Sequence, residues 1–355
     1  MAPARIAVIG GGAIGLKHID VLSPGSKDYV LCAIADPAPM GAEAARQRGV
    51  PHFAAYEEMF DKAKPDGVVV AVPNQLHLEV GLACVARKVP MIMEKPVADT
   101  LAAAVKLVDA ATRENVPLLI GHHRRYNPIM RKAAQMIRDG AVGRVVAVSA
   151  MWLGHKPEDY FTIGWRREKG AGPVLINAIH DIDCLRMMCG DIDAVQASSA
   201  SAVRGFAVED TAATVLRFMS GALGTLIISD TASTPWNWEW TSRENPNYPH
   251  QWENCFFVGG TTGSLSIPSL EHRWHEPGRE SWHAPLTEKR IPVAQADPYY
   301  EQMRHFSALI AGREKPVMSG EEGVKTLAST IAINESAASG MPVKVDDLLK
   351  RAAAA

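Results

Sequence analysis

The chain has 355 residues, of which 47% are hydrophobic and 21% charged, and its formal net charge at pH 7 is -2. These values are typical of a soluble globular protein of two domains, and they exclude a general electrostatic attraction to nucleic acid or to an anionic membrane. The five cysteines form no Cys-x-x-Cys pair. We therefore expect reduced thiols, a cytoplasmic location and no metal site. No run of about 18 apolar residues occurs, so we also expect no membrane span.

Up to residue 123 the sequence alternates short apolar runs with segments of helical periodicity. The runs predict strands at Ile6–Ile9, Val30–Ala35, Gly67–Val72, Met91–Met93 and Leu118–Ile120. The periodic segments predict helices at Ala13–Leu22, Met40–Arg48, Leu76–Arg87 and Leu101–Thr112. Continuous apolar strands separated by helices are typical of a parallel sheet with helices on both faces. We therefore assign residues 1–123 to a doubly wound α/β domain of the Rossmann type.

From residue 124 onward, predicted strands follow one another with few helices between them. The strands are Arg144–Trp152, Ala194–Ala200, Thr211–Phe218, Leu223–Ser229, Asn254–Val258 and Ser264–Ile267; the helices are Pro128–Asp139, Leu175–Cys189, Pro298–Ala311 and Glu321–Ser339. The segments 232–252 and 273–292 are rich in Pro, Trp and His and are expected to be loops. This grouping predicts an α+β domain over residues 124–355 with a mostly antiparallel open sheet. We expect the helix 321–339 to pack back on the first domain.

A glycine-rich turn joins the first predicted strand to the first predicted helix. Gly10, Gly12 and Gly15 match the pattern G-x-G-x-x-G, which is weak alone but here stands between a strand and a helix. In that setting Gly10 permits the tight turn, Gly12 lets the backbone approach a pyrophosphate and Gly15 lets the helix pack on the strand. Ala13 and Ile14 then open the helix, whose N-terminus faces the anion. The alternative is a glycine turn in an ordinary βα unit.

An acidic residue follows the second predicted strand. Asp36 lies 21 residues after Gly15, where a carboxylate that binds the ribose hydroxyls of a dinucleotide is expected. A carboxylate would repel a 2′-phosphate, and Pro37 stands where NADP enzymes often carry Arg or Ser. The sequence therefore favours NAD over NADP, unless Asp36 is only a turn residue at the strand end.

Polar residues also follow the next two long apolar strands. Asn74 and His77 come after the strand Gly67–Val72, and each could touch the cofactor or cap the following helix. Glu94 and Lys95 come after Met91–Met93, and we expect both to lie at the cofactor. A lysine at the end of a buried strand is costly unless it is paired or functional, and burial suits it to general acid–base work. The alternative is a lysine that simply leaves the sheet.

Four segments together resemble the Gfo/Idh/MocA oxidoreductase family, which includes inositol dehydrogenases and glucose–fructose oxidoreductases. They are Gly10–Gly15, Asn74–His77, the tripeptide Glu94-Lys95-Pro96, and Asn177–Asp183 with its His-Asp-Ile-Asp sequence. The resemblance covers essentially the whole chain. It implies that Lys95 is the catalytic lysine, that the bond before Pro96 is cis, and that His180 reaches the substrate site from the second domain.

One position departs from the family pattern. Many sugar and inositol members carry an Asp four residues before this His, where the chain has Ile176. Asn177, three residues before His180, lies on the same face of a regular helix and would orient the substrate, because an amide cannot accept a proton as a carboxylate does. Lys95 and His180 would then share the proton transfer, with Asp183 orienting the imidazole. The alternative for His180 is a buried packing residue.

The remaining substrate candidates lie near the start of the second domain. Arg124 and Tyr126 belong to a segment that resembles the family's link between domains, although salt bridging is an alternative for the arginine. A loop then mixes cations with aromatic rings, a combination suited to a hydroxylated ligand with an anionic group. Its candidates are His155, Lys156, Tyr160, Trp165 and Arg166. If they lie in a strand, Trp236, Trp238 and Trp240 share one face, and we prefer a subunit contact there over a sugar platform.

These features predict an NAD-dependent dehydrogenase that oxidises a secondary alcohol of a sugar, a cyclitol or a related hydroxylated ring, with or without a carboxylate. Three alternatives stay open: an NAD-using glycosidase without net redox, a trans-dihydrodiol dehydrogenase, and a non-catalytic dinucleotide-binding regulator. By resemblance, we expect a homodimer or homotetramer formed through the open face of the second sheet, and no nucleic-acid or membrane partner.

Overall fold

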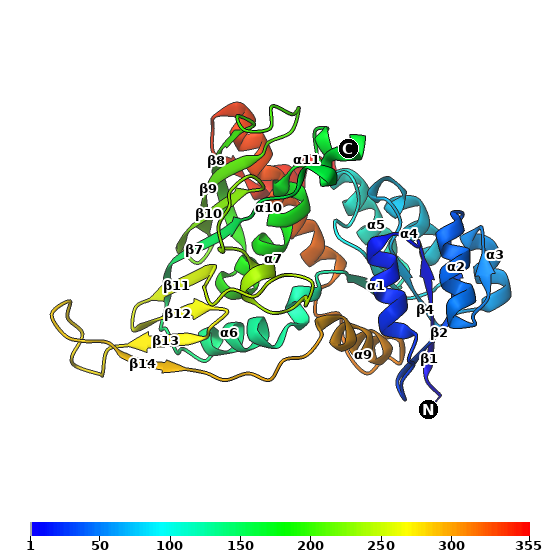
Figure 1. Cartoon of the computed structure of the whole chain (residues 1–355), viewed down its shortest axis with the longest axis horizontal. Coiled ribbons are helices and arrows are strands. Elements are labelled where there is room, and N and C mark those ends of the chain that lie inside the picture. The colour runs from blue at the N-terminus through cyan, green and yellow to red at the C-terminus, as the bar shows by residue number, and fades with distance from the viewer. Residues whose placement is uncertain (1) are drawn as a thin grey trace. The chain divides into compact units, whose positions relative to one another are not determined.

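The computed structural model describes residues 2–355 and divides the chain into two compact units. The first unit contains the residues up to Tyr126 together with Asp297–Leu327 and Arg351–Ala355. The second contains Asn127–Ala296 and Ala328–Lys350. Figure 1 shows the chain with those elements labelled for which there is room, numbered in chain order.

The first unit is built on a six-stranded parallel sheet, and the apolar runs predict its parallel arrangement and five of its strands. Its order is β3-β2-β1-β4-β5-β6, with every neighbouring pair parallel. The strands are β1 (Ala4–Ile9), β2 (Tyr29–Ala35), β3 (His52–Phe53), β4 (Gly67–Val70), β5 (Met91–Met93) and β6 (Leu118–Ile120). All residues of β4, β5 and β6 are buried, because helices cover both faces of the sheet.

The helices of this unit also follow the predicted pattern closely. They are α1 (Ala13–Leu22), α2 (Pro39–Arg48), α3 (Tyr56–Ala63), α4 (His77–Ala86), α5 (Leu101–Arg113) and, from later in the chain, α9 (Pro298–Ile310); the single turn η1 (Asn74–Leu76) precedes α4. The prediction omitted β3 and α3. Both are short, and α3 buries only Met59 and Phe60, so neither carries a long apolar pattern.

The second unit is built on a nine-stranded sheet with the order β14-β13-β12-β11-β7-β10-β9-β8-β15. Its strands are β7 (Val145–Leu153), β8 (Ile192–Ala200), β9 (Thr211–Phe218), β10 (Leu223–Ser229), β11 (Phe256–Gly260), β12 (Gly263–Ile267), β13 (Glu271–Trp274), β14 (Thr287–Arg290) and β15 (Val343–Lys344). Only β7 and β10 are parallel neighbours; the other pairs are antiparallel, as predicted. The carboxyl ends of β7 and β10 therefore meet at one edge.

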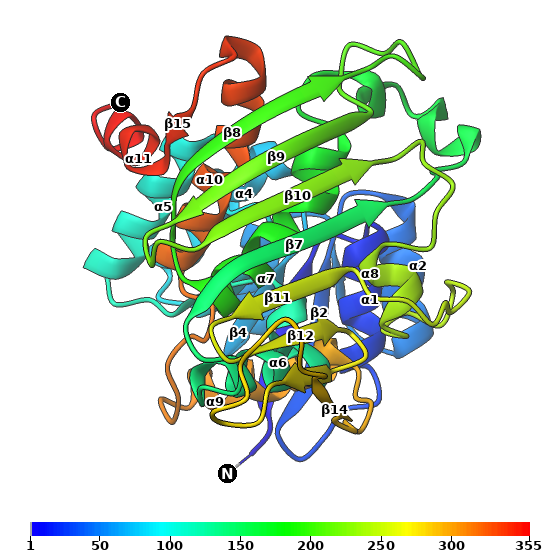
Figure 2. The ribbon, with the colours of Figure 1, turned by 90° about the vertical axis from the view of Figure 1, so that its left-hand side faces the viewer.

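One face of this sheet is open. Along β9 and β10 buried and exposed residues alternate, and Val215, Leu223 and Ile227 are among the exposed large hydrophobic residues. On the other face lie α6 (Pro128–Arg138) and α7 (Ile179–Cys189), which contact β12 and β7. Figure 2 shows β8, β9, β10 and β7 with no helix drawn across them.

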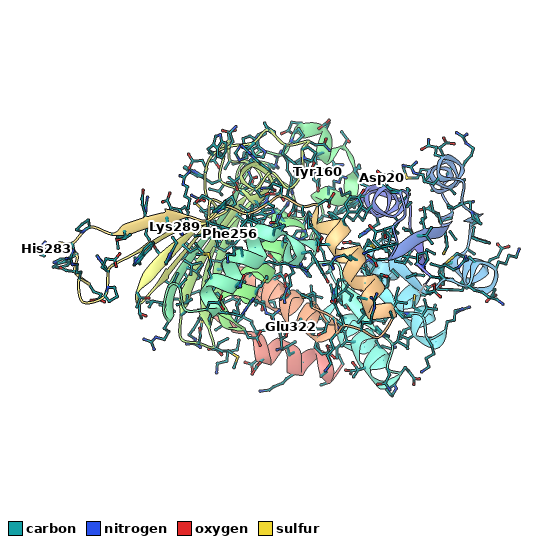
Figure 3. All side chains as sticks on the ribbon, turned by 90° about the horizontal axis from the view of Figure 1, so that it is seen from below. Asp20, Tyr160, Phe256, His283, Lys289 and Glu322 are labelled. Atoms are coloured by element: carbon teal, nitrogen blue, oxygen red, sulfur yellow. The ribbon has the colours of Figure 1, made fainter. Side chains whose placement is uncertain are left out.

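Two expectations for the second unit were wrong. The segment 273–292, expected to be a loop, contains the second half of β13 and all of β14, whose hairpin carries Lys289 and extends to His283 (Figure 3). Its residues are half-buried or exposed, so no apolar alternation marks the strands. The segment 232–252 contains the short helix α8 (Trp238–Thr241). No element was predicted after residue 339, where the chain forms α11 (Val345–Ala353) with Val345 and Leu348 buried.

The long helix α10 (Gly320–Ser339) belongs to both units, since the division falls between Leu327 and Ala328. At its start, Gly323 packs so closely on Ile120 of β6 that a β-carbon would lie 2.7 Å from that side chain. No helix of residues 2–355 is long and apolar enough to cross a membrane.

Candidate functional site

The glycines of the turn after β1 have the local geometry that the pattern predicts. Gly10 has a φ of +100°, which a residue with a β-carbon rarely adopts, and an added β-carbon would collide with the backbone of Ala71. A β-carbon on Gly15 would collide with the carbonyl oxygen of Gly10. These two glycines therefore let α1 start directly over the end of the strand.

Gly12 differs from both because no atom lies within 4 Å of a β-carbon placed there. It is the N-cap of α1, has no capping side-chain hydrogen bond, and is exposed together with Ala13. Ile14 follows in the same first turn, half-buried. The first N–H groups of a helix have no partner inside it and carry partial positive charge. The residues present thus fit a dinucleotide pyrophosphate at this helix start.

Asp36 lies at the end of β2 and is 8% exposed. Its Oδ2 accepts a hydrogen bond from the backbone N–H of Gly11, and its Oδ1 accepts one from Ala38 at 2.6 Å. Gly41 leaves space for this side chain, since a β-carbon there would collide with Asp36. A carboxylate offers about four lone-pair sites, so the two backbone bonds leave capacity for ribose hydroxyls.

Asn74 and His77 follow β4 but have different surroundings. Asn74 is exposed in η1. His77 is fully buried, and its ring nitrogens lie 2.8 Å from the carbonyl oxygen of Pro96 and 3.0 Å from that of Val72. Burial lowers the pKa of His77. These two contacts hold the His77 side chain in place within the protein. A contact between His77 and the cofactor stays a prediction.

Glu94 and Lys95 follow β5, and the Lys95–Pro96 peptide bond is cis, as the family resemblance implies. Glu94 is 5% exposed and Lys95 is half-buried. The Oε1 atom of Glu94 lies 2.7 Å from Nε2 of His18, a residue of α1. Burial by itself would raise the pKa of Glu94, but the hydrogen bond from His18 and the charges of nearby basic groups hold it below its usual value. A buried, ionised carboxylate therefore stands next to Lys95 in sequence.

The segment η2 (His123–Tyr126) lies at the end of the first stretch of chain that belongs to the first unit. Arg124 is 2% exposed, and Arg125 lies 3.8 Å from Glu322 of α10. Tyr126 has no exposed surface, and its hydroxyl lies 2.6 Å from Nδ1 of His305 in α9. This position favours a packing role for Tyr126. The substrate contacts predicted for Arg124 and Tyr126 stay predictions.

In the second unit, the predicted helix 175–189 has two parts. Residues Val174–Ala178 form a π-helical turn, η5, and α7 follows directly. A π-turn bonds residue i to i+5, so the α-helical spacing on which a common face for Asn177 and His180 rested does not apply across it. Single π-turns in helices occur frequently at functional sites.

The polar side chains of this helix are largely buried. His180 is 9% exposed and Asp183 1%. Asn177 is half-buried, and its buried Oδ1 atom accepts no hydrogen bond from the described residues. A buried acceptor without a partner costs about 1–3 kcal/mol. The surroundings of Asn177 therefore fit a hydrogen bond from a ligand.

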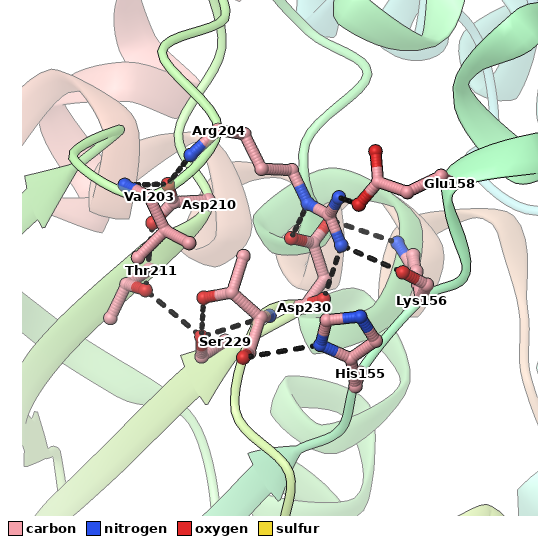
Figure 4. A network of polar contacts seen from close by, with 10 residues as sticks. His155, Lys156, Glu158, Val203, Arg204, Asp210, Thr211, Ser229 and Asp230 are labelled. Atoms are coloured by element: carbon pink, nitrogen blue, oxygen red, sulfur yellow. Dashed lines mark hydrogen bonds and ion pairs between the residues drawn. The ribbon is translucent and has the colours of Figure 1, made fainter.

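The loop after β7 holds a buried ionic cluster (Figure 4). Lys156 Nζ lies 3.6 Å from Asp230 Oδ2, and Arg204 Nε donates to Asp230 Oδ1 at 3.1 Å. Burial, only partly offset by Asp230, lowers the pKa of Lys156 to about 8, and burial also raises the pKa of Asp230. His155 is exposed, with Nδ1 3.3 Å from the carbonyl oxygen of Thr231.

The aromatic candidates of this loop are stacked with its cations. Lys156 Nζ lies 4.9 Å and the Arg166 guanidinium 3.9 Å from the centroid of the Tyr160 ring. Arg166 donates to the Tyr160 carbonyl oxygen at 2.8 Å, while its buried Nε has no hydrogen-bond partner. Trp165 is 57% exposed, with its ring 5.7 Å from the Arg166 guanidinium. Tyr160 and Arg166 thus form one ordered cation–aromatic group.

The expectation that Trp236, Trp238 and Trp240 share one face of a strand was wrong. Trp238 and Trp240 lie in α8, which Asn237 caps by accepting a hydrogen bond from Trp240 N–H. Trp238 is buried against Phe256 and donates to Glu244 at 3.1 Å, whereas Trp236 is 39% exposed. A helical turn does not place residues two apart on one face.

Two partner residues in these contacts, His18 and Asp230, are not among the residues predicted from the sequence. His18 is the sixth residue of α1, three residues after Gly15, and only its contact with Glu94 distinguishes it. Asp230 follows the apolar strand β10 directly, as Asp36 follows β2, which is a signal that could have identified it.

Within the first unit, the predicted cofactor residues follow β1, β2, β4 and β5, which are neighbours in the order β2-β1-β4-β5. Their carboxyl ends share one edge, where doubly wound sheets bind ligands. The glycine turn, the free helix start and Asp36 at this edge define the class of NAD-binding oxidoreductases.

Comparison with known proteins agrees. Residues 4–122 match the model of the oxidoreductase family with an NAD-binding Rossmann fold, and residues 130–266 match the GFO/IDH/MocA C-terminal domain. The chain therefore belongs to the Gfo/Idh/MocA oxidoreductase family, which confirms the resemblance in the sequence.

Individual relatives match over nearly the whole chain. The 1,5-anhydro-D-fructose reductase of Ensifer adhaerens is 27% identical over 348 residues, covering 96% of this chain and 98% of the relative. The myo-inositol 2-dehydrogenase of Thermotoga maritima is 26% identical over 366 residues, covering 97% and 99%. The WlbA dehydrogenase of Bordetella pertussis, solved with NADH and UDP-GlcNAcA, shares the fold with a TM-score of 0.77 and 22% identity, covering 96% and 98%.

Proposed function

We propose that the protein oxidises a secondary alcohol of a sugar, a cyclitol or a related hydroxylated ring, using NAD. The observation that carries this proposal is Lys95, which follows the buried and ionised Glu94 at the same sheet edge as the glycine turn. The names of the relatives support the substrate class, since one is a reductase of an anhydro sugar and another a dehydrogenase of an inositol.

In the oxidation direction, Lys95 takes the proton of the reacting hydroxyl. When bound, NAD supplies the acceptor for the hydride that leaves the same carbon. The backbone at Gly12 and the first turn of α1 hold the pyrophosphate, and Asp36 holds the ribose and disfavours a 2′-phosphate. Asn74, His77 and Glu94 border the cofactor in this proposal.

His180 assists the proton transfer, and Asp183 orients its ring. The Oδ1 atom of Asn177 accepts a hydrogen bond from a second hydroxyl of the substrate, which would satisfy this otherwise unpartnered buried acceptor. The rings of Tyr160 and Trp165 suit the carbon face of a hydroxylated ring. Arg166 suits an anionic substituent because its buried Nε has no hydrogen-bond partner among residues 2–355. His155, Lys156, Arg124 and Tyr126 complete the proposed substrate set.

Substitution of Lys95 tests the reaction. Lys95→Ala should lower the rate of NADH formation on a panel of sugars and cyclitols by about 10²- to 10⁴-fold, the usual contribution of a general acid–base group. NAD binding, followed by thermal shift, should persist. Lys106→Ala, which removes an exposed lysine of α5, is the matched control and should retain the rate.

Turnover of Lys95→Ala near the wild-type rate would refute the role of Lys95. The products separate the alternatives: a free sugar released without net NADH indicates a glycosidase, and an aromatic diol indicates a trans-dihydrodiol dehydrogenase. NAD binding without turnover on any substrate indicates a regulator.

We also propose that the protein forms a homodimer or homotetramer through the open face of the second sheet. Val215 of β9, Leu223 and Ile227 of β10 and Phe257 of β11 are 51%, 56%, 38% and 39% exposed; β9 and β10 are neighbours in the sheet, and β7 lies between β10 and β11. An exposed apolar patch of this kind favours a protein contact. The molar mass in solution tests this assembly.

A further inference from the structure

A buried histidine–glutamate pair stands behind the proposed catalytic lysine. Nε2 of His18 lies 2.7 Å from Oε1 of Glu94, and the two side chains are 0% and 7% exposed. His18 comes from the middle of α1, 76 residues from Glu94. The pair therefore joins the helix of the glycine turn to the end of β5.

The surroundings of the two ring nitrogens of His18 show which of them carries the proton donated to Glu94. Nδ1 of His18 is buried and has no hydrogen-bond partner among the described residues. The hydrogen bond to Glu94 consequently depends on the proton at Nε2. Tyr299 of α9 closes the site from another side, with its ring edge-on to His18 at a centroid distance of 5.4 Å.

The same carboxylate contacts the backbone of Lys95. Its Oε2 atom accepts a hydrogen bond from the Lys95 N–H at 3.2 Å. Gly121, after β6, leaves the space for the carboxylate, because a β-carbon there would lie 2.7 Å from Oε1. Glu94 is thus held between α1, its own strand end and the end of β6.

The groups that act on Glu94 are all basic. His18 reaches it from α1, His123 from η2 and His77 from the start of α4, and Lys95 is its neighbour in the chain. A carboxylate this deeply buried would favour the protonated form without such partners. Of these groups, His18 donates a side-chain hydrogen bond to Glu94, with Nε2 2.7 Å from Oε1.

We propose that His18 is a positioning residue for Lys95: by donating to Glu94 it keeps that carboxylate charged and in place beneath the Lys95 peptide. The inference rests on the proposed role of Lys95 as the general base. His18 touches neither the reacting atoms nor the substrate in this proposal. It acts through Glu94, which fixes the backbone from which the lysine side chain leaves and supplies a negative charge near it.

Three substitutions separate a positioning role from mere packing. His18→Gln keeps an N–H at the position of Nε2, whereas His18→Asn has the same chemistry but stops at the position of Nδ1. His18→Leu fills the site without a donor. Loss of the donor lets Glu94 take up a proton, so the cationic form of Lys95 loses a nearby anion and its pKa should fall by about one unit.

In turnover, we expect kcat to fall roughly tenfold in the Asn and Leu variants. The limb of the pH profile that reports Lys95 should move to lower pH, while KM for NAD changes little. The Gln variant should restore both kcat and the profile. If the Asn and Gln variants both behave as the wild type does, the proposal is overturned; this comparison decides the matter even if the Leu variant fails to fold.

A second measurement needs no substrate. Trace acetylation of the whole protein at a series of pH values, read by mass spectrometry of the Lys95 peptide, gives the titration of Lys95 directly. The expected order is wild type equal to Gln and above Asn. An unchanged titration in Asn refutes the role of His18, whereas a shifted titration in an enzyme that oxidises no polyol refutes only the proposed function.

Discussion

The buried ammonium of Lys156 gives the sharpest prediction about stability. Its side chain is 12% exposed and lies 3.6 Å from Asp230, yet burial lowers its pKa from 10.5 to about 8. Arg204, itself bound to Asp230, adds to that shift. The unfolded chain therefore binds more protons at this residue than the folded chain does between about pH 8 and 10.5.

The size of the effect follows from the two pKa values. Each unit of difference is about 1.4 kcal/mol, so Lys156 lowers the free energy of unfolding by about 3 kcal/mol below pH 8. This penalty disappears as the pH rises from 8 to 10.5, because both states then carry a neutral amine. Lys156→Met removes the titration altogether.

The difference in melting temperature between Lys156→Met and the wild type isolates the contribution of the Lys156 ammonium to stability. Thiols such as Cys32 and Cys84, whose pKa burial raises to about 11 and 12, destabilise both proteins equally at high pH. Relative to the wild type, the melting temperature of Lys156→Met should fall by roughly 6–12 °C between about pH 7 and 10.5, at 2–4 °C per kcal/mol for a domain of this size. Differential scanning fluorimetry under reducing conditions measures it.

Lys169→Met is the matched control, since Lys169 is exposed in the same loop. Its melting temperature should differ from that of the wild type by the same amount at every pH. A flat difference for Lys156→Met as well would show that Lys156 is not charged and buried as the structure places it, and the reasoning would fail.

Two further predictions concern the cofactor and the assembly. Asp36→Ala should weaken NAD binding roughly 10- to 100-fold, as expected for a lost hydrogen bond to a charged group, and should raise the affinity for NADP relative to NAD. Calorimetry measures both affinities, and Asp61→Ala on α3 serves as the control. An unchanged preference for NAD over NADP would contradict the assignment of Asp36. Ile227→Glu should reduce an oligomer to monomers in light scattering, whereas Met219→Glu, an exposed change at the turn between β9 and β10, should not; an unchanged mass for Ile227→Glu, or a monomeric wild type, would refute the contact.

The parallel sheet could be predicted because all of its strands except the two-residue β3 are marked locally. β1, β5 and β6 are short apolar runs bounded by turn residues, and burial on both faces removes any need for polar alternation. Gly10 and Asp36 could be placed for the same reason, since their positions follow from the strand ends. The hairpin of β13 and β14 could not, because an exposed edge carries no apolar pattern.

The candidate site, like the fold, could be predicted from the sequence only in part. The sequence by itself determined the fold class, the cofactor turn and the position of Lys95 after a buried strand. Only the tertiary structure decided the partners: His18 meets Glu94 across 76 residues, and Lys156 meets Asp230 from a different strand end. It also placed α9 in the first unit and bent the start of the His180 helix into a π-turn. Local patterns report which face of a segment is buried, whereas the pairing of buried charges depends on which segments the packed core brings together.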